Sequence, residues 1–247
     1  PLTLARMPRE TERAIFEIGM NTPGEIAPRS LMVRPHVAMI TRIAPAHLAG
    51  MGSVEGVADE KSQIFAGLQD GGAAILPAED KFHDRLHAAA LQLQRSAKLY
   101  TYGGAAGSRA ATPVRYETDG FTSRIGIDVM GEVVSVSLNA VGEHWAGNAA
   151  LALLAAVLSG VHARDAAEAL SGYAPPAGRG VAEMLKLPQG GEVTLVDDAY
   201  NANPESMRAA IEGFGRRPGR RIVALGEMRE LGEGSAALHA GLADAIT

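Results

Sequence analysis

Runs of apolar residues alternate, in the first part of the chain, with segments whose apolar residues recur at helical spacing. The runs predict strands at residues 14–20, 37–43, 73–76 and 98–102. Helices are predicted at 53–68, where Ser53 is placed to cap the first turn, and at 80–94. Strands that alternate with helices are typical of an α/β fold built on a mostly parallel sheet flanked by helices.

The pattern changes after residue 113. Residues 114–139 predict antiparallel strands with turns at 119–120 and 130–131, and helices are expected at 145–158 and 164–170. The segment 172–180 is rich in Pro and Gly, which favours a domain boundary there. We therefore expect one domain over residues 1–177 and a second over 178–247.

The second domain begins as another α/β unit. Its expected elements are a hairpin turning near 189–191, a strand at 193–196, a helix at 204–214, a strand at 221–225 and a helix from 235. Asn203 and Pro204 mark the start of the first helix, because Asn is a favoured N-cap and Pro suits the first helical position.

The amino-acid composition excludes several classes of protein. Hydrophobic residues make up 47% of the 247 positions, which is enough for a substantial core. Basic and acidic side chains number 23 and 28, a net charge of 23 − 28 = −5, which argues against a general nucleic-acid binder. There is no Cys, so disulfides and thiolate metal sites are excluded, and no apolar run is long enough to predict a membrane span.

Three residues of the first domain are candidates for chemistry, each with an ordinary alternative. Glu17 lies in an apolar strand, where a carboxylate needs a partner or a metal unless it faces solvent at an edge. His47 follows the strand 37–43 after a short loop, at the edge of the sheet where α/β proteins bind ligands. A histidine there can be a metal ligand, although a helix-capping or loop histidine is the simpler interpretation. Lys61, taken alone, is a solvated surface lysine.

A cluster of polar residues follows the strand 193–196. Acidic groups at the end of a strand suit ribose hydroxyls or a cation, whereas Asn and Asp also favour turns for backbone reasons alone. The cluster comprises Asp197, Asp198, Tyr200, Asn201 and Asn203. From these residues alone, the sequence indicates an α/β protein with a ligand site.

Taken together, five strings in this order resemble the Mur ligase family of peptidoglycan synthesis. They are FEIGMNTPGEI (16–26), ITRIAPAHLAGMGSVEGVADEKSQIF (40–65), GEHWAGNAALA (142–152), VDDAYNANPESMRAA (196–210) and ALGEMRELGE (224–233). The strings DDAYNANPESM and APAHLAGMGS are similar to those of the member that adds D-alanyl-D-alanine to UDP-N-acetylmuramoyl-tripeptide. The resemblance covers nearly the whole chain.

The resemblance implies a bacterial cytoplasmic ligase that uses ATP and Mg²⁺. ATP phosphorylates the terminal carboxylate of the sugar peptide, and the dipeptide amine displaces phosphate from the acyl phosphate. By resemblance, Glu17 and His47 hold Mg²⁺, and Lys61 is carried as a carbamate that helps position the metal. The remaining implied contacts are Asn148 with adenine, Arg179 with the ATP phosphates, Asp198 with the ribose, Tyr200 beside the nucleotide, and Asn201, Asn203 and Ser206 toward the substrate.

The sequence also departs from the family pattern. The pair before Asn148 is usually His-Asn, whereas here it reads His144-Trp145. The sequence also contains no GxxGK[ST] phosphate loop. We therefore expect a monomeric fragment, a central ATP-binding domain without its phosphate loop followed by a partial Rossmann-like domain, inactive by itself. The alternatives are another amide ligase of the superfamily, such as a tripeptide-forming Mur enzyme or folylpolyglutamate synthetase, and a non-catalytic binding module.

Overall fold

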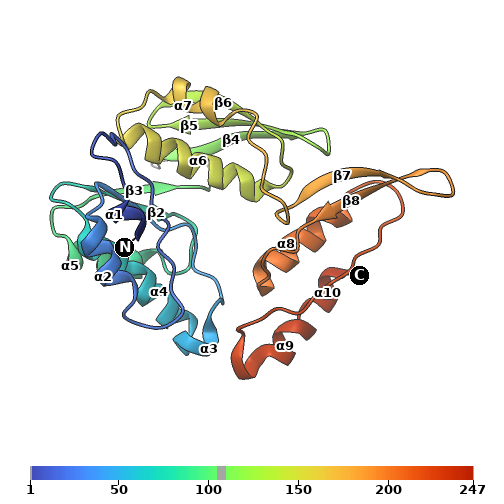
Figure 1. Cartoon of the computed structure of the whole chain (residues 1–247), viewed down its shortest axis with the longest axis horizontal. Helices are drawn as coiled ribbons and strands as arrows, with labels where there is room; N and C mark the ends of the chain where they lie inside the picture. The colour runs from blue at the N-terminus through green and yellow to red at the C-terminus, as the bar shows by residue number, and fades with distance from the viewer. Residues whose placement is uncertain (1, 105–109, 247) are drawn as a thin grey trace.

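A six-stranded sheet forms the centre of the computed structural model, which describes residues 2–104 and 110–246 (Figure 1). Its strands, in spatial order, are β1 (Val37–Met39), β2 (Ala73–Pro77), β3 (Lys98–Tyr102), β4 (Ala111–Thr118), β5 (Ser123–Val129) and β6 (Glu132–Leu138). The first four pair in parallel and the last three in antiparallel fashion. The expected α/β fold, with a parallel sheet extended by antiparallel strands, is confirmed.

Helices cover both faces of the parallel strands because residues along a strand point alternately to opposite sides. Ile75 of β2 packs with α6 (Glu143–Leu158) and α7 (Ala163–Leu170), whereas its neighbours Ala74 and Leu76 join the opposite core. That second core is formed with α2 (Ile26–Val33), α4 (Val54–Ser62), the 3-10 helix η1 (Gln63–Gly67) and α5 (His83–Leu93). The short helices α1 (Leu2–Ala5) and α3 (Leu48–Met51) complete what we call the six-stranded unit.

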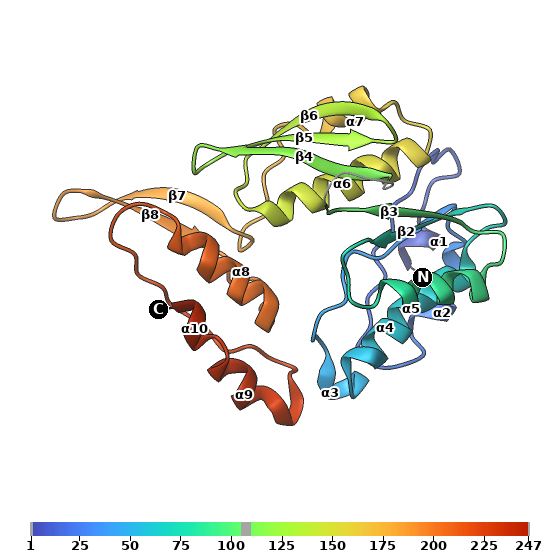
Figure 2. The same cartoon turned by 180° about the vertical axis from the view of Figure 1, so that it is seen from behind.

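The rest of the described chain forms a smaller unit, which we call the hairpin unit (Figures 1 and 2). It comprises the antiparallel pair β7 (Val181–Lys186) and β8 (Glu192–Asp197), then α8 (Pro204–Gly215), the 3-10 helix η2 (Gly232–Gly234), α9 (Ser235–Ala240) and α10 (Ala243–Ile246). Ile211, Met228, Leu231 and Leu242 make its small core. None of the described helices has the length and apolar character of a membrane span.

Two predicted strands are wrong. Residues 14–20 form no regular element, because Ile18 and Met20 pack against the helices while no described strand pairs with the segment, and Ile15 is 91% exposed. Residues 221–225 are also irregular, and Ile222 is 75% exposed. The hairpin unit therefore lacks, over its described residues, the parallel strand that the expected Rossmann-like domain required.

The predicted strand 37–43 is shorter than expected for a local reason. The Ile40 amide still donates to the Ile75 carbonyl at 3.1 Å, which continues the ladder by one bond. Beyond it, the Thr41 carbonyl accepts from the Tyr102 hydroxyl, and the Ile43 amide donates to Asp80 Oδ2 at 2.8 Å. Side chains thus replace strand pairing at the carboxyl end of β1, which frees this segment to form a loop.

Candidate active site

The segment 40–47, between β1 and α3, is held at the carboxyl ends of the parallel strands. Asp80, after β2, accepts from the amides of Ile43 at 2.8 Å and Phe82 at 2.9 Å. Tyr102, at the end of β3, donates its hydroxyl proton to Thr41, and burial raises the pKa of Tyr102 to about 12. Since ligands of α/β proteins bind outside this edge of the sheet, the segment lies where a site is expected.

Lys61 points to this same edge. From the last turn of α4 its Nζ donates to the carbonyl oxygen of Arg42 at 2.7 Å. Partial burial lowers the pKa of Lys61, and the negative charge of Asp80 offsets part of that effect. Lys61 is therefore a half-buried amine facing the loop after β1, and the reading as a solvated surface lysine is wrong.

Glu60, next to Lys61 on α4, contacts the loop before α2. Its buried carboxylate accepts from the amides of Gly24 and Ile26, each at 2.8 Å, at the start of α2. A Cβ atom on Gly50 of α3 would overlap the carbonyl oxygen of Asn21, so α3 packs directly on this loop. The chain segments that carry Glu17, His47 and Lys61 are thus joined through α3 and α4.

The three predicted metal-site side chains do not bond to one another. Glu17 is exposed in the irregular segment 14–20, and Nδ1 of His47 pairs with Oε2 of Glu230 at 2.5 Å. Among the residues that the structure describes, no group of three or more His, Cys, Asp or Glu side chains suits a metal ion. Glu17 and His47 still offer a carboxylate oxygen and an imidazole nitrogen, which are donor types that bind divalent cations in proteins.

A second group of predicted residues gathers at the start of the hairpin unit. The guanidinium of Arg179 lies 4.2 Å from the centre of the Tyr200 ring, a cation–π arrangement. The Tyr200 amide donates to the carbonyl of Gly178 at 3.0 Å. Desolvation and the charge of Asp197 raise the pKa of Asp198, and Arg179 partly opposes them, so Arg179, Asp198 and Tyr200 share one electrostatic environment.

The remaining predicted residues differ in their local contacts. Asn203 is the N-cap of α8, and it forms a capping box with Ser206, which explains both residues structurally. Asn201 is exposed in the loop before α8. Asn148 is exposed on α6, and no described contact links it to Arg179 or Asp198. The aromatic ring of Trp145 lies 5.3 Å from His144 and 5.7 Å from Tyr173.

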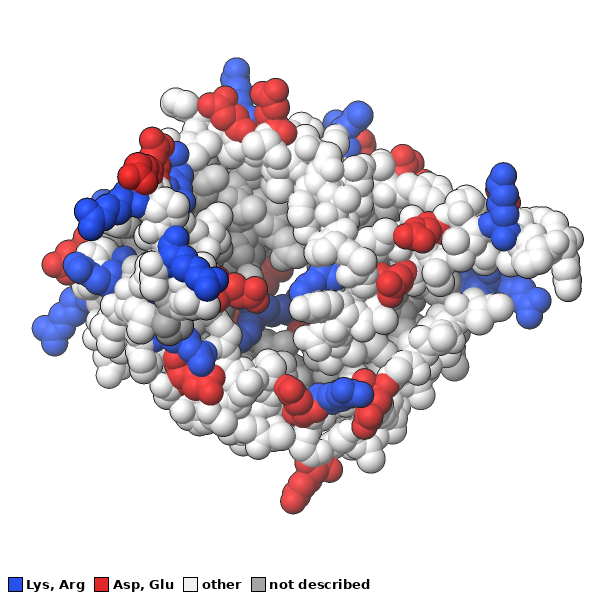
Figure 3. Space-filling view, in the orientation of Figure 1, with Lys and Arg blue, Asp and Glu red and all other residues white. Residues whose placement is uncertain are grey.

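The two units touch through charged pairs that the sequence did not predict. Arg42 pairs with Glu205 in the first turn of α8, His47 pairs with Glu230, and Arg216 lies 3.9 Å from Glu143. The surface is hollowed between the units, and side chains of both charges lie in the hollow (Figure 3). Asp80 carried a positional signal, because it follows a predicted strand as His47 does.

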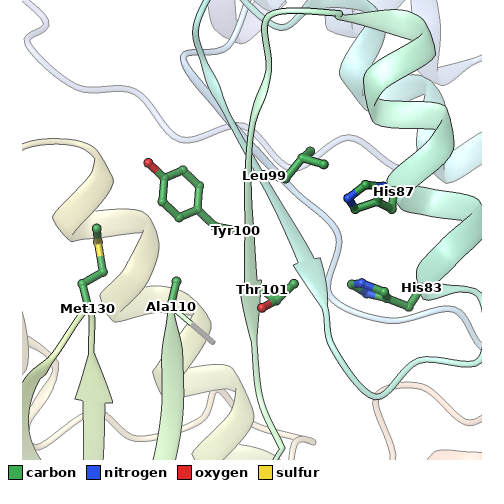
Figure 4. Close-up of a pocket in the computed structure, with 7 residues that line it drawn as sticks. All are labelled: His83, His87, Leu99, Tyr100, Thr101, Ala110 and Met130. Carbon is green, nitrogen blue, oxygen red and sulfur yellow. The ribbon is translucent and has the colours of Figure 1, made fainter. Parts of the chain in front are cut away.

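A cavity of about 530 Å³ lies elsewhere, around β3 (Figure 4). His83 and His87 of α5 face it on one side of the strand, and Tyr100 and Met130 on the other. None of the predicted site residues lines this cavity. This cavity is therefore separate from the residues that the sequence predicts to act.

Comparison with known proteins gives matches over both units. Residues 1–156 match the Mur ligase middle domain, and residues 183–247 match the family described as Mur ligase, glutamate ligase domain. UDP-N-acetylmuramoyl-tripeptide–D-alanyl-D-alanine ligase of Escherichia coli is 35% identical over 246 residues, which cover 99% of this chain and 52% of that protein. The chain thus spans about half the length of the curated relatives it matches.

Solved structures agree with these matches. A crystal structure of MurF from Acinetobacter baumannii superposes with a TM-score of 0.87 at 29% identity, over 98% of this chain and 51% of that one. MurF ligase from Thermotoga maritima in complex with ADP has a TM-score of 0.77 at 23% identity, over 93% of this chain and 51% of that one. The second likeness shows a shared fold.

Proposed function

This chain belongs to the Mur ligase family, and we propose that it serves the ATP-dependent addition of D-alanyl-D-alanine to UDP-N-acetylmuramoyl-tripeptide in the bacterial cytoplasm. One observation carries the proposal: Lys61 is a half-buried amine of lowered pKa that faces the loop leading to His47. We also propose that residues 1–177 form the central ATP-binding domain and residues 178–247 part of the C-terminal domain. The relatives that act on these substrates support the assignment.

Lys61 serves, in this proposal, as a carbamate. The neutral amine attacks CO₂, an N–C bond forms, and the amine proton leaves to solvent, which converts a cation into an anion. Because burial lowers the pKa of Lys61, the neutral amine is more abundant there than on an exposed lysine. Glu17 and His47 hold Mg²⁺ with the carbamate, and Mg²⁺, when bound, neutralises charge on the phosphoryl oxygens.

In this proposal, the nucleotide lies across the hollow between the units. Asn148 contacts adenine, Asp198 the ribose, and Arg179 the phosphates, with Tyr200 beside the nucleotide. Stacking on Tyr200 holds the Arg179 guanidinium in one orientation, and its position at the start of the hairpin unit lets movement of that unit bring the positive charge to the phosphates. Asn201, Asn203 and Ser206 face the peptide substrate.

The test uses the protein at its full encoded length. Phosphate release is followed with ATP, Mg²⁺ and the UDP-sugar tripeptide, with and without D-alanyl-D-alanine. The proposal expects release that depends on the dipeptide and is not supported by L-alanyl-L-alanine or glutamate. Release supported by glutamate would instead assign a different amide ligase, and tight ATP binding in calorimetry without any turnover would favour a binding module.

A further inference from the structure

We propose that Glu230 is a positioning residue for His47, supplied by the hairpin unit, so that the free nitrogen of the His47 ring is oriented only when the two units are in contact. The inference rests on the proposed function, in which His47 binds Mg²⁺. Nδ1 of His47 lies 2.5 Å from Oε2 of Glu230, the spacing of a short hydrogen bond to a carboxylate. Because a carboxylate only accepts, the proton of this hydrogen bond is on Nδ1, and Nε2 is the ring nitrogen left for a metal ion.

The backbone of Glu230 is fixed by burial on both sides. Met228 is 1% exposed and Leu231 is 4% exposed, and both belong to the core of the hairpin unit. The Met228 amide donates to Nε2 of His239 at 2.9 Å, which fixes the approach to Glu230. The carboxylate is therefore presented by an anchored turn rather than by a mobile arm.

Both partners adopt a backbone conformation that is uncommon outside glycine. His47 has φ 55° at the N-cap of α3, and Glu230 has φ 62°. The Ala49 amide donates to the Glu230 carbonyl at 3.3 Å, so a backbone bond accompanies the side-chain pair. Positive φ values at two touching residues cluster at functional sites, because the surrounding structure must hold them in place.

An ordinary surface ion pair would predict little effect from losing Glu230. The His47 side chain is 35% exposed and that of Glu230 is 59% exposed, and pairs of such exposure contribute little to stability. A carboxylate that orients a metal-binding histidine behaves differently, because it fixes the tautomer and raises the basicity of the ligand nitrogen. The two roles therefore differ in metal affinity and in which ring nitrogen carries the hydrogen-bonded proton, not in stability.

The experiment compares Glu230→Ala, Glu230→Gln and His47→Ala with the unaltered protein at its full encoded length. Glu233→Gln, in the exposed η2 turn three positions away, is the matched control for loss of charge. Mn²⁺ replaces Mg²⁺ as the probe, and its affinity is measured by electron paramagnetic resonance at a fixed concentration of a non-hydrolysable ATP analogue. Ring ¹⁵N shifts of His47 are recorded in the metal-free protein.

The proposal expects Glu230→Ala to weaken Mn²⁺ binding by about tenfold or more and to move the His47 proton from Nδ1 toward Nε2. Glu230→Gln, whose amide oxygen still accepts, should recover part of both effects, and Glu233→Gln should change neither. If His47→Ala weakens Mn²⁺ binding while Glu230→Ala leaves affinity and ring shifts unchanged, this inference is wrong and the metal site stands. If His47→Ala has no effect on Mn²⁺, the proposed metal site fails as well.

Discussion

Lys61 donates from Nζ to the backbone carbonyl of Arg42 across 2.7 Å, and so joins the end of α4 to the loop after β1. The same Arg42 reaches the hairpin unit through its side chain, which pairs with Glu205. A residue predicted to act at the phosphate therefore touches the element that connects the two units.

The first prediction concerns Lys61→Ala. Removal of the amine abolishes the carbamate, so turnover should fall by roughly a hundredfold or more, the scale on which loss of one electrostatic group acts in a closed site. Added bicarbonate should not restore activity, because the variant has no amine to carbamylate. Lys186→Ala, an exposed lysine of β7, is the control and should keep full activity. Steady-state phosphate release measures both, and an active Lys61→Ala protein would remove Lys61 from the site.

The second prediction concerns the close contact of α3 with the loop before α2. Gly50→Ala places a methyl group against the Asn21 carbonyl, so the loop or α3 must move, and we expect destabilisation of about 2–3 kcal/mol. Gly213→Ala in α8 meets nothing within 4 Å and should stabilise by up to about 1 kcal/mol, as Ala does inside a helix. Urea unfolding compares them, and equal stability of the two variants would show that the contact is loose.

Apolar patterns predicted the elements whose partners lie within the described chain. Lys98–Tyr102 was predicted with its observed bounds, and it pairs with β2 and β4. Residues 14–20 carry a similar run and form no strand, because an apolar run reports burial, whereas a strand also needs a neighbour for its amides and carbonyls. Both predicted helix caps, Ser53 and Asn203, are confirmed, since a cap bonds only to the next few residues.

The residues of the candidate site also differ in how far the sequence predicts their positions. The position of Lys61 at the edge of the sheet followed only from the resemblance, because a lysine on a helix gives no sign of its own burial. Glu230 lies 183 positions from His47, and their pairing depends on how the two units meet. No local pattern contains that information. Contacts between the units therefore become visible only in the three-dimensional structure.

The third prediction uses the pKa of Tyr102, which burial raises from 10.0 to about 12. A raised folded-state pKa gives stability that is complete below pH 10 and is lost as pH rises to about 12, because the unfolded chain ionises first. That loss should reach about 2–3 kcal/mol. The Tyr102→Phe variant has no phenol to ionise, so it lacks this pH-dependent loss of stability. Because it also lacks the hydrogen bond to the Thr41 carbonyl, the variant should be about 1 kcal/mol less stable than the unaltered protein at pH 8. Its deficit should therefore shrink or reverse above pH 10 in denaturant titrations, and a constant deficit would contradict the burial.

The last prediction separates two roles of Asn203. Its Oδ1 accepts from the amides of Glu205 at 3.1 Å and Ser206 at 2.9 Å, whereas no hydrogen bond from Nδ2 occurs within the described chain. Asn203→Asp keeps the acceptor and removes the donor, and Asn203→Ala removes both. If the amide nitrogen binds substrate, Asn203→Asp should raise the KM for the sugar peptide or the dipeptide severalfold with an unchanged free energy of unfolding.

Asn203→Ala should raise the same KM and also lose about 1 kcal/mol of stability, because the first turn of α8 loses its cap. Ser206→Ala removes the reciprocal bond from the Asn203 amide, which spans 3.1 Å, and its free energy of unfolding measures that half of the capping box. Its KM is no control, because Ser206 is itself proposed to face the substrate. An unaltered KM in Asn203→Asp, measured beside a loss of stability in Asn203→Ala, would leave capping as the whole role of this residue. The pattern of the three variants therefore assigns each polar atom of the side chain to folding or to binding.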